Sequence, residues 1–207
     1  MSQYNIFIKI NYVMYKNMHY SKQRQKVSLA LVSLRTDGTS ECAQRAPLFR
    51  SLLSEVSDLL KNNVLWYGIN SDRIHPTNSS DTVQACAPKI TMCGTQRSGS
   101  FNENECWKNI VKDLAHYEAI ISSYIELKDL RHPDEEVPPL RQTLQMIQNL
   151  LKVCIQHIKT IGLWVRNSSY SNRQKMLMMM RAFHIRTITF NRAVGYIASG
   201  DARKDQE

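Results

Sequence analysis

The sequence contains few residues that interrupt helices and no long apolar run. Its 207 residues include only seven glycines and six prolines. No apolar run approaches the ~20 residues that a membrane-spanning helix needs, so we expect no membrane span. With 43% hydrophobic and 22% charged residues, the composition predicts a globular, helical chain that is long enough for one domain with its own core.

The motifs of common enzymes and metal sites are also missing. The sequence has no C-x-x-C pair, G-x-S-x-G, P-loop, dinucleotide-binding fingerprint or H-E-x-x-H. A di-iron helix bundle needs Glu-x-x-His on two helices. The nearest approach is Asp113 followed by His116, and there Tyr117, rather than the Asp, falls on the apolar side of the segment. We therefore expect no catalytic activity, no cofactor and no bound metal ion.

Four segments repeat apolar residues at intervals of three and four, which is the spacing of an amphipathic helix. They cover residues 47–66, 104–130, 140–161 and 173–198. Without a convincing strand, they predict an all-α four-helix bundle over residues 46–199, followed by a polar tail at 200–207. The connections are long, short and long, which favours an up-up-down-down topology with a long first crossover loop pinned by disulfides.

The last of these segments has two apolar faces. One face is a core stripe whose members are spaced four and three residues apart: Met176, Met180, Phe183, Thr187, Phe190, Val194 and Ile197. The five residues from Met176 to Met180 span about one and a half turns, so Met178 and Met179 cannot both share that stripe. A second face carries Ile185, Ile188, Thr189, Arg192 and Tyr196. A solvated basic face is the plain interpretation, but an arginine between apolar and aromatic neighbours is typical of an interface anchor.

The net charge of +9 is unevenly distributed. Residues 1–45 contain seven Lys or Arg against two Asp or Glu, and the rest of the chain contains 20 against 16. A basic run at 22–26, an apolar run at 27–34 and small residues at 38–40 fit a signal peptide, and a disordered or amphipathic extension fits equally well. Because the rest of the chain is only mildly basic, its net charge gives little support to nucleic-acid binding.

Cysteines and glycosylation sequons favour a secreted chain. Five cysteines are an odd number, so one is left as a buried thiol or for a bridge to another chain. Three of them, Cys86, Cys93 and Cys106, lie in or beside the long first connection. The sequons at Asn78 and Asn167 lie in predicted loops, where a glycan could be accepted.

Three blocks of sequence resemble one family. They are residues 182–196 (AFHIRTITFNRAVGY), residues 82–86 (TVQAC), and Cys106 followed by Asp113, Leu114 and Tyr117. Over residues 47–199 the chain is similar to the alpha subunits of interleukin-12, which are long-chain helical cytokines of the interleukin-6 type. The resemblance implies a secreted, extracellular subunit that pairs with a receptor-like beta subunit. The pair would bind the interleukin-12 receptor chains and act through JAK–STAT signalling to promote interferon-gamma production and T-helper type 1 immunity.

The resemblance also implies roles for particular residues. Arg192 matches an arginine that enters an acidic pocket of the beta subunit, with Arg186, Thr189 and Tyr196 around it, and Ile185 and Ile188 on the same face. Tyr170 matches an aromatic residue that contacts the signalling receptor. Cys86 and Cys106 match a pair bridged within the subunit, and Cys93 matches the cysteine bonded to the beta subunit.

The chain departs from the family at its other cysteines. A second family bridge joins the positions of Gly68 and Leu177, where both partners are missing here. Cys154 falls on the core stripe of the third segment, which predicts a buried thiol, with a Cys42–Cys154 bridge as the alternative. Two other functions remain open: a related alpha subunit of the interleukin-23 type, and a basic helical module that binds nucleic acid or anionic membranes.

Overall fold

The computed structural model describes residues 44–76, 80–87, 101–126, 137–154, 164 and 168–199, which all belong to one unit spanning 34–207. Within this part the chain is all-α, and no strand occurs there. The predicted leader, Cys42, Cys93, the two sequon asparagines and the polar tail lie outside the described residues. The helices in order are α3 (Ala46–Leu60), a 3₁₀ turn η1 (Ser71–Arg73), α4 (Asp81–Ala85), α5 (Glu103–Glu126), α6 (Pro138–Cys154) and α7 (Ser169–Ala198).

Helix α3 ends at Leu60, earlier than the predicted residue 66. The Asn62 side chain accepts a hydrogen bond from the backbone N–H of Leu65 at 2.8 Å, which replaces helical pairing with a local turn. Apolar spacing predicts Val64 as the last member of the apolar stripe of the segment 47–66, but Val64 is 51% exposed, so that prediction is wrong. Gly68 then adopts φ 72°, a left-handed conformation that glycine tolerates without steric cost.

Helix α7 begins before the predicted residue 173. The Ser168 side chain accepts from the backbone N–H of Ser171 at 3.2 Å and so caps the first turn. The short helix α4 was not predicted at all, because five residues give no period to recognise. Its signal is Ser80, whose side chain caps the N–H of Val83 at 3.1 Å.

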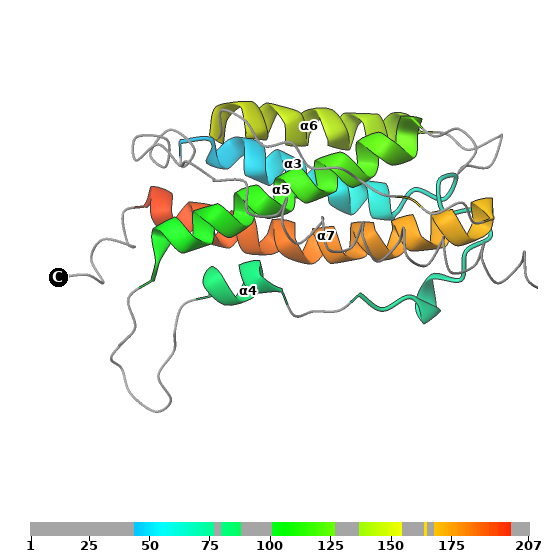
Figure 1. The fold of residues 1–207 in the computed structure, drawn as a ribbon, viewed down its shortest axis with the longest axis horizontal. Coiled ribbons are helices and arrows are strands. Elements are labelled where there is room, and N and C mark those ends of the chain that lie inside the picture. The colour runs from blue at the N-terminus through cyan, green and yellow to red at the C-terminus, as the bar shows by residue number, and fades with distance from the viewer. Residues whose placement is uncertain are drawn as a thin grey trace, which may run out of the picture. The chain divides into compact units, whose positions relative to one another are not determined.

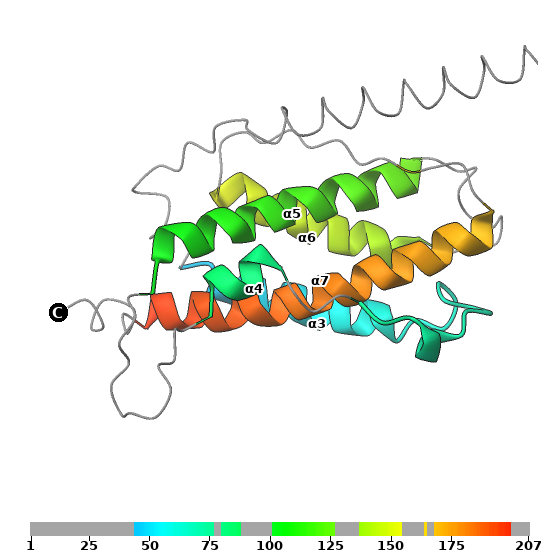
Figure 2. The ribbon, with the colours of Figure 1, turned by 60° about the horizontal axis from the view of Figure 1, so that its bottom comes forward.

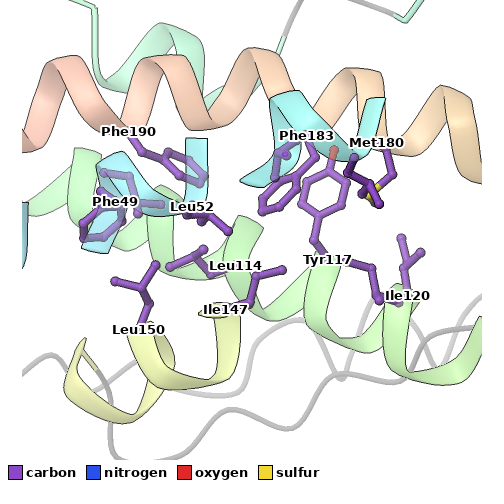
Figure 3. Close-up of a cluster of buried hydrophobic side chains, with 14 of the residues drawn as sticks. Phe49, Leu52, Leu114, Tyr117, Ile120, Ile147, Leu150, Met180, Phe183 and Phe190 are labelled. Carbon is purple, nitrogen blue, oxygen red and sulfur yellow. The ribbon is translucent and has the colours of Figure 1, made fainter. Parts of the chain in front are cut away.

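The long helices share one core. Helix α3 packs on α6 and α7, α5 packs on α6 and α7, and α4 lies over α5 and α7 (Figures 1 and 2). All seven predicted core-stripe residues of α7 are buried. The five residues that the same spacing predicts on one face of the segment 104–130 are also buried: Ile110, Leu114, Tyr117, Ile121 and Tyr124. Aromatic rings fill the centre: Tyr117 and Phe183 have centroids 4.2 Å apart, and Phe190 meets Phe49 edge-on at 6.3 Å (Figure 3). No helix in the described residues has the length and apolarity that a membrane crossing requires.

Candidate protein interface on helix α7

The outer face of α7 lies opposite its core stripe and carries the predicted interface residues. Arg192 is exposed, and four neighbours on this face are partly exposed: Ile185, Ile188, Thr189 and Tyr196. Met178 continues the same face towards the start of the helix and is 40% exposed, which confirms that the methionine run leaves the core. We call this set the outer face of α7.

Arg192 forms no hydrogen bond or ion pair with any of the residues that the structure describes. Ile188 and Tyr196 lie one turn before and one turn after it. The Tyr196 ring packs edge-on against Phe101 with centroids 5.4 Å apart, so its position is fixed from within the chain. The guanidinium therefore projects from an ordered, partly apolar surface with its donors available to another molecule.

Arg186 lies on a different side of the helix from Arg192. Six residues separate them, which places them about 120° apart around the axis. The Nε of Arg186 is 3.4 Å from Oδ2 of Asp113 on α5, and these side chains are only 12% and 18% exposed. Helix α4 adds Thr82, whose side chain hydrogen-bonds to Asp113. The structure thus places Arg186 in an ion pair beside α4, apart from Arg192.

Burial dominates the electrostatics of this ion pair. It raises the pKa of Asp113, although the Thr82 hydrogen bond and Arg186 act in the opposite direction. The carboxylate Oδ2 receives no aligned hydrogen bond from a described residue, which explains why the attraction of Arg186 does not offset desolvation. Burial also raises the pKa of the neighbouring Tyr117 to about 12, so its phenol stays neutral.

A disulfide fixes α4 next to this pair. Cys86, which caps α4, is bonded to Cys106 in the first turn of α5 with an Sγ–Sγ distance of 2.06 Å. This is the pair that the family resemblance implied. Cys154 is also disulfide-bonded, so the prediction of a buried thiol is wrong. Cys154 is the last residue of α6, and apolar spacing predicts that it is buried but carries no information about a covalent partner.

Comparison with known proteins returned no relative. No family model, curated protein or solved structure matches the chain significantly. The candidate interface therefore depends on the sequence resemblance and on the geometry described above. No group of three side chains that could hold a metal ion occurs in the part of the chain that the structure describes.

The predicted receptor contact lies at the other end of α7. Tyr170, in the first turn, is 46% exposed. Between Tyr170 and Arg192, the remaining cations of the helix are engaged within the chain. Lys175 lies over the Trp164 ring at 5.0 Å, and Arg173 and Arg181 donate to backbone carbonyls of the segment after α3. Sequence patterns missed the two arginine contacts, because their acceptors are main-chain atoms that carry no sequence signal.

Proposed function

We propose that this chain is the alpha subunit of a secreted, heterodimeric cytokine of the interleukin-12 type. It pairs with a receptor-like beta subunit, binds the interleukin-12 receptor chains and activates JAK–STAT signalling that promotes interferon-gamma production and T-helper type 1 immunity. It is not an enzyme in this proposal and needs no cofactor. The observation that carries the proposal is Arg192, which is exposed on the partly apolar outer face of α7 and has no side-chain partner among the described residues.

The arrangement of the helices supports a cytokine bundle. We propose an up-up-down-down topology with a long first crossover. In Figure 1, α3 and α5 start at one end of the helical layers, and α6 and α7 start at the other. The disulfide between Cys86 and Cys106 ties the second part of that crossover to the start of α5.

The outer face has the chemistry of a binding-site centre. An exposed arginine between Ile188 and Tyr196 offers five N–H donors on an apolar background, and such residues are enriched among interface hot spots. An acidic pocket on the beta subunit is the complementary partner. Ile185 and Thr189 extend the contact along the same face, while Arg186 supports it indirectly through its ion pair with Asp113.

Replacing Arg192 tests the proposal directly. Arg192→Ala should weaken pairing with the beta subunit by about 2–4 kcal/mol, as for an interface hot spot. Because the Arg192 side chain bonds to none of the described residues and is exposed, the melting temperature of the isolated subunit should not change. Arg141→Ala on α6 is the matched control, since that arginine is also exposed. Equal dissociation constants for the two variants would refute the anchor role of Arg192.

A further inference from the structure

Two arginines of α7 hold the segment that follows α3. The Nη1 of Arg173 donates to the carbonyl oxygen of Tyr67 at 2.7 Å. Two turns later, the Nη1 of Arg181 donates to the carbonyl oxygens of Ser71 and Ile74, both at 2.6 Å. Between them Leu177 is buried. The two arginines therefore attach residues 67–74 to α7 at both ends of that segment.

Besides these bonds, the segment is held by Ile74, which is 5% exposed and part of the core, and by Ile69, which packs against the core. The segment's own backbone bonds are short-range: Ile69 N–H donates to Trp66, and Ile74 N–H donates to Ser71. Gly68 has open space around its Cα and a left-handed φ, so no packing fixes the chain there. Hydrogen bonds from a guanidinium are charge-assisted and stronger than neutral ones. The two arginines therefore fix the backbone carbonyls of this segment, in addition to the apolar packing of Ile69 and Ile74.

Arg173 is a costly residue for a purely structural role. Its side chain is only 8% exposed, and its Nε is buried without a hydrogen-bond partner in the described residues. No described acidic side chain forms an ion pair with it. Burying a guanidinium in this way is unfavourable unless its remaining hydrogen bond is retained. The burial of the Arg173 guanidinium is thus unfavourable in itself, and its hydrogen bond fixes the position of the Tyr67 carbonyl.

The position of the Tyr67 backbone matters because the side chain of this residue is exposed to solvent. Tyr67 is 78% exposed, and Arg173, which holds its carbonyl, lies one turn after the exposed Tyr170. Both views of the fold place the segment after α3 at the end where α7 begins (Figures 1 and 2). Tyrosine presents a large ring and a polar tip with little loss of side-chain entropy, which suits a protein contact.

We propose that Arg173 and Arg181 are positioning residues that form a clamp. The clamp holds residues 67–74 on α7, so that Tyr67 and Tyr170 present one aromatic surface to the signalling receptor chain. This inference rests on the proposed function and adds Tyr67 to the receptor contact. Tyr170 and Arg192 are 22 residues apart, which is roughly 33 Å along the helix. A receptor at one end and a beta subunit at the other can therefore bind at the same time.

The clamp itself is tested on the full-length chain by limited proteolysis with trypsin. Arg173→Ala/Arg181→Ala should increase cleavage after Arg73 at least tenfold and speed hydrogen exchange at the Ile74 amide. Arg141→Ala, which removes an exposed arginine of α6, should change neither. If the double variant does not fold by circular dichroism, the two single variants are compared instead. Unchanged cleavage and exchange in folded variants overturn the clamp.

The receptor surface is tested on the heterodimer with the extracellular part of the signalling receptor chain. Tyr67→Ala and the clamp variant should each weaken receptor binding at least tenfold without changing pairing with the beta subunit, and Tyr67→Phe should retain binding. Leu48→Ala, at an exposed apolar site on the other end of α3, is the control. If Tyr170→Ala weakens binding and Tyr67→Ala does not, the shared surface is refuted. A wild-type heterodimer that binds no receptor overturns the proposed function together with this surface. The clamp is tested separately by the trypsin cleavage rates, which do not depend on receptor binding.

Discussion

At the scale of single residues, the Lys and Arg side chains of α7 differ in what each one contacts. Of its five Lys and Arg residues, Lys175 lies over Trp164, and Arg173 and Arg181 bond to main-chain carbonyls. Arg186 is paired with a carboxylate, and Arg192 is the one with no polar side-chain partner among the described residues. A helix that bound nucleic acid would need several free cations, because each phosphate contact is neutralised separately. The geometry therefore favours recognition of one acidic pocket by one arginine.

The Asp113 carboxyl gives a prediction about pH. Burial raises its pKa above the ordinary value of 3.8 in the folded chain, so the folded state holds this proton more tightly than the unfolded state does. Its contribution to stability is therefore complete at acidic pH and is lost as the pH rises through the raised pKa. Asp113→Asn cannot titrate.

The wild type should resemble Asp113→Asn most closely below pH 3.8 and become less stable relative to it above that value. Urea unfolding of both proteins at several pH values measures the difference. Asp58→Asn, at an exposed surface site, controls for the loss of one carboxylate. A difference that moves in favour of the wild type as the pH rises would show that Arg186 outweighs burial.

At the scale of elements, α4 depends on the disulfide that ties it to α5. Five residues cannot form a stable isolated helix. The Cys86–Cys106 bond closes a loop of about 20 residues, which stabilises a fold by about 3 kcal/mol when the unfolded chain loses that freedom. Cys86→Ser/Cys106→Ser should therefore lower the free energy of unfolding by about that amount, with the fastest hydrogen exchange at the Val83 and Cys86 amides. Exchange in α3 should stay slow, and equal acceleration everywhere would contradict a local role for the bond.

The same elements show what the sequence could predict. The core stripe of α7 and the apolar face of α5 were predicted residue by residue, because burial alone sets a period of three and four. The end of α3 was predicted too late, since the Asn62 side chain stops the helix by a local hydrogen bond that apolar spacing does not record. The place of Arg192 on the exposed outer face was predictable from its spacing in the helix, whereas its role at an interface remains a proposal. The placement of Arg186 beside Asp113 and α4 was not predictable from the sequence. The two paired residues are 73 positions apart, and α4 is held next to them by the Cys86–Cys106 disulfide.

At the scale of the whole molecule, one helix serves three contacts. Its inner face completes the core. In the proposed function, its outer face at Arg192 binds the beta subunit and its exposed first turn at Tyr170 binds the receptor. An alpha subunit with such a face left uncovered should be secreted poorly alone. An interleukin-23-type chain would share the fold but select a different receptor, so the receptor chain that binds the secreted pair separates these two relatives.

Cys93 gives a prediction about how the pair is joined. Co-expression with an interleukin-12 beta subunit should yield a heterodimer that runs as one band without reducing agent and as two bands with it. Cys93→Ser should leave a non-covalent pair that dissociates faster and that Arg192→Ala weakens further, since the covalent bond and the arginine act independently.

Because Cys154 is itself disulfide-bonded and Cys86 is bonded to Cys106, peptide mapping should find Cys154 joined to Cys42. Recovery of a Cys93–Cys154 peptide would refute the bridge from Cys93 to the beta subunit.

A different outcome would favour the alternative of a basic helical module. In that case the chain would be secreted as a stable monomer, and it would bind DNA or anionic vesicles with an affinity that falls steeply with salt.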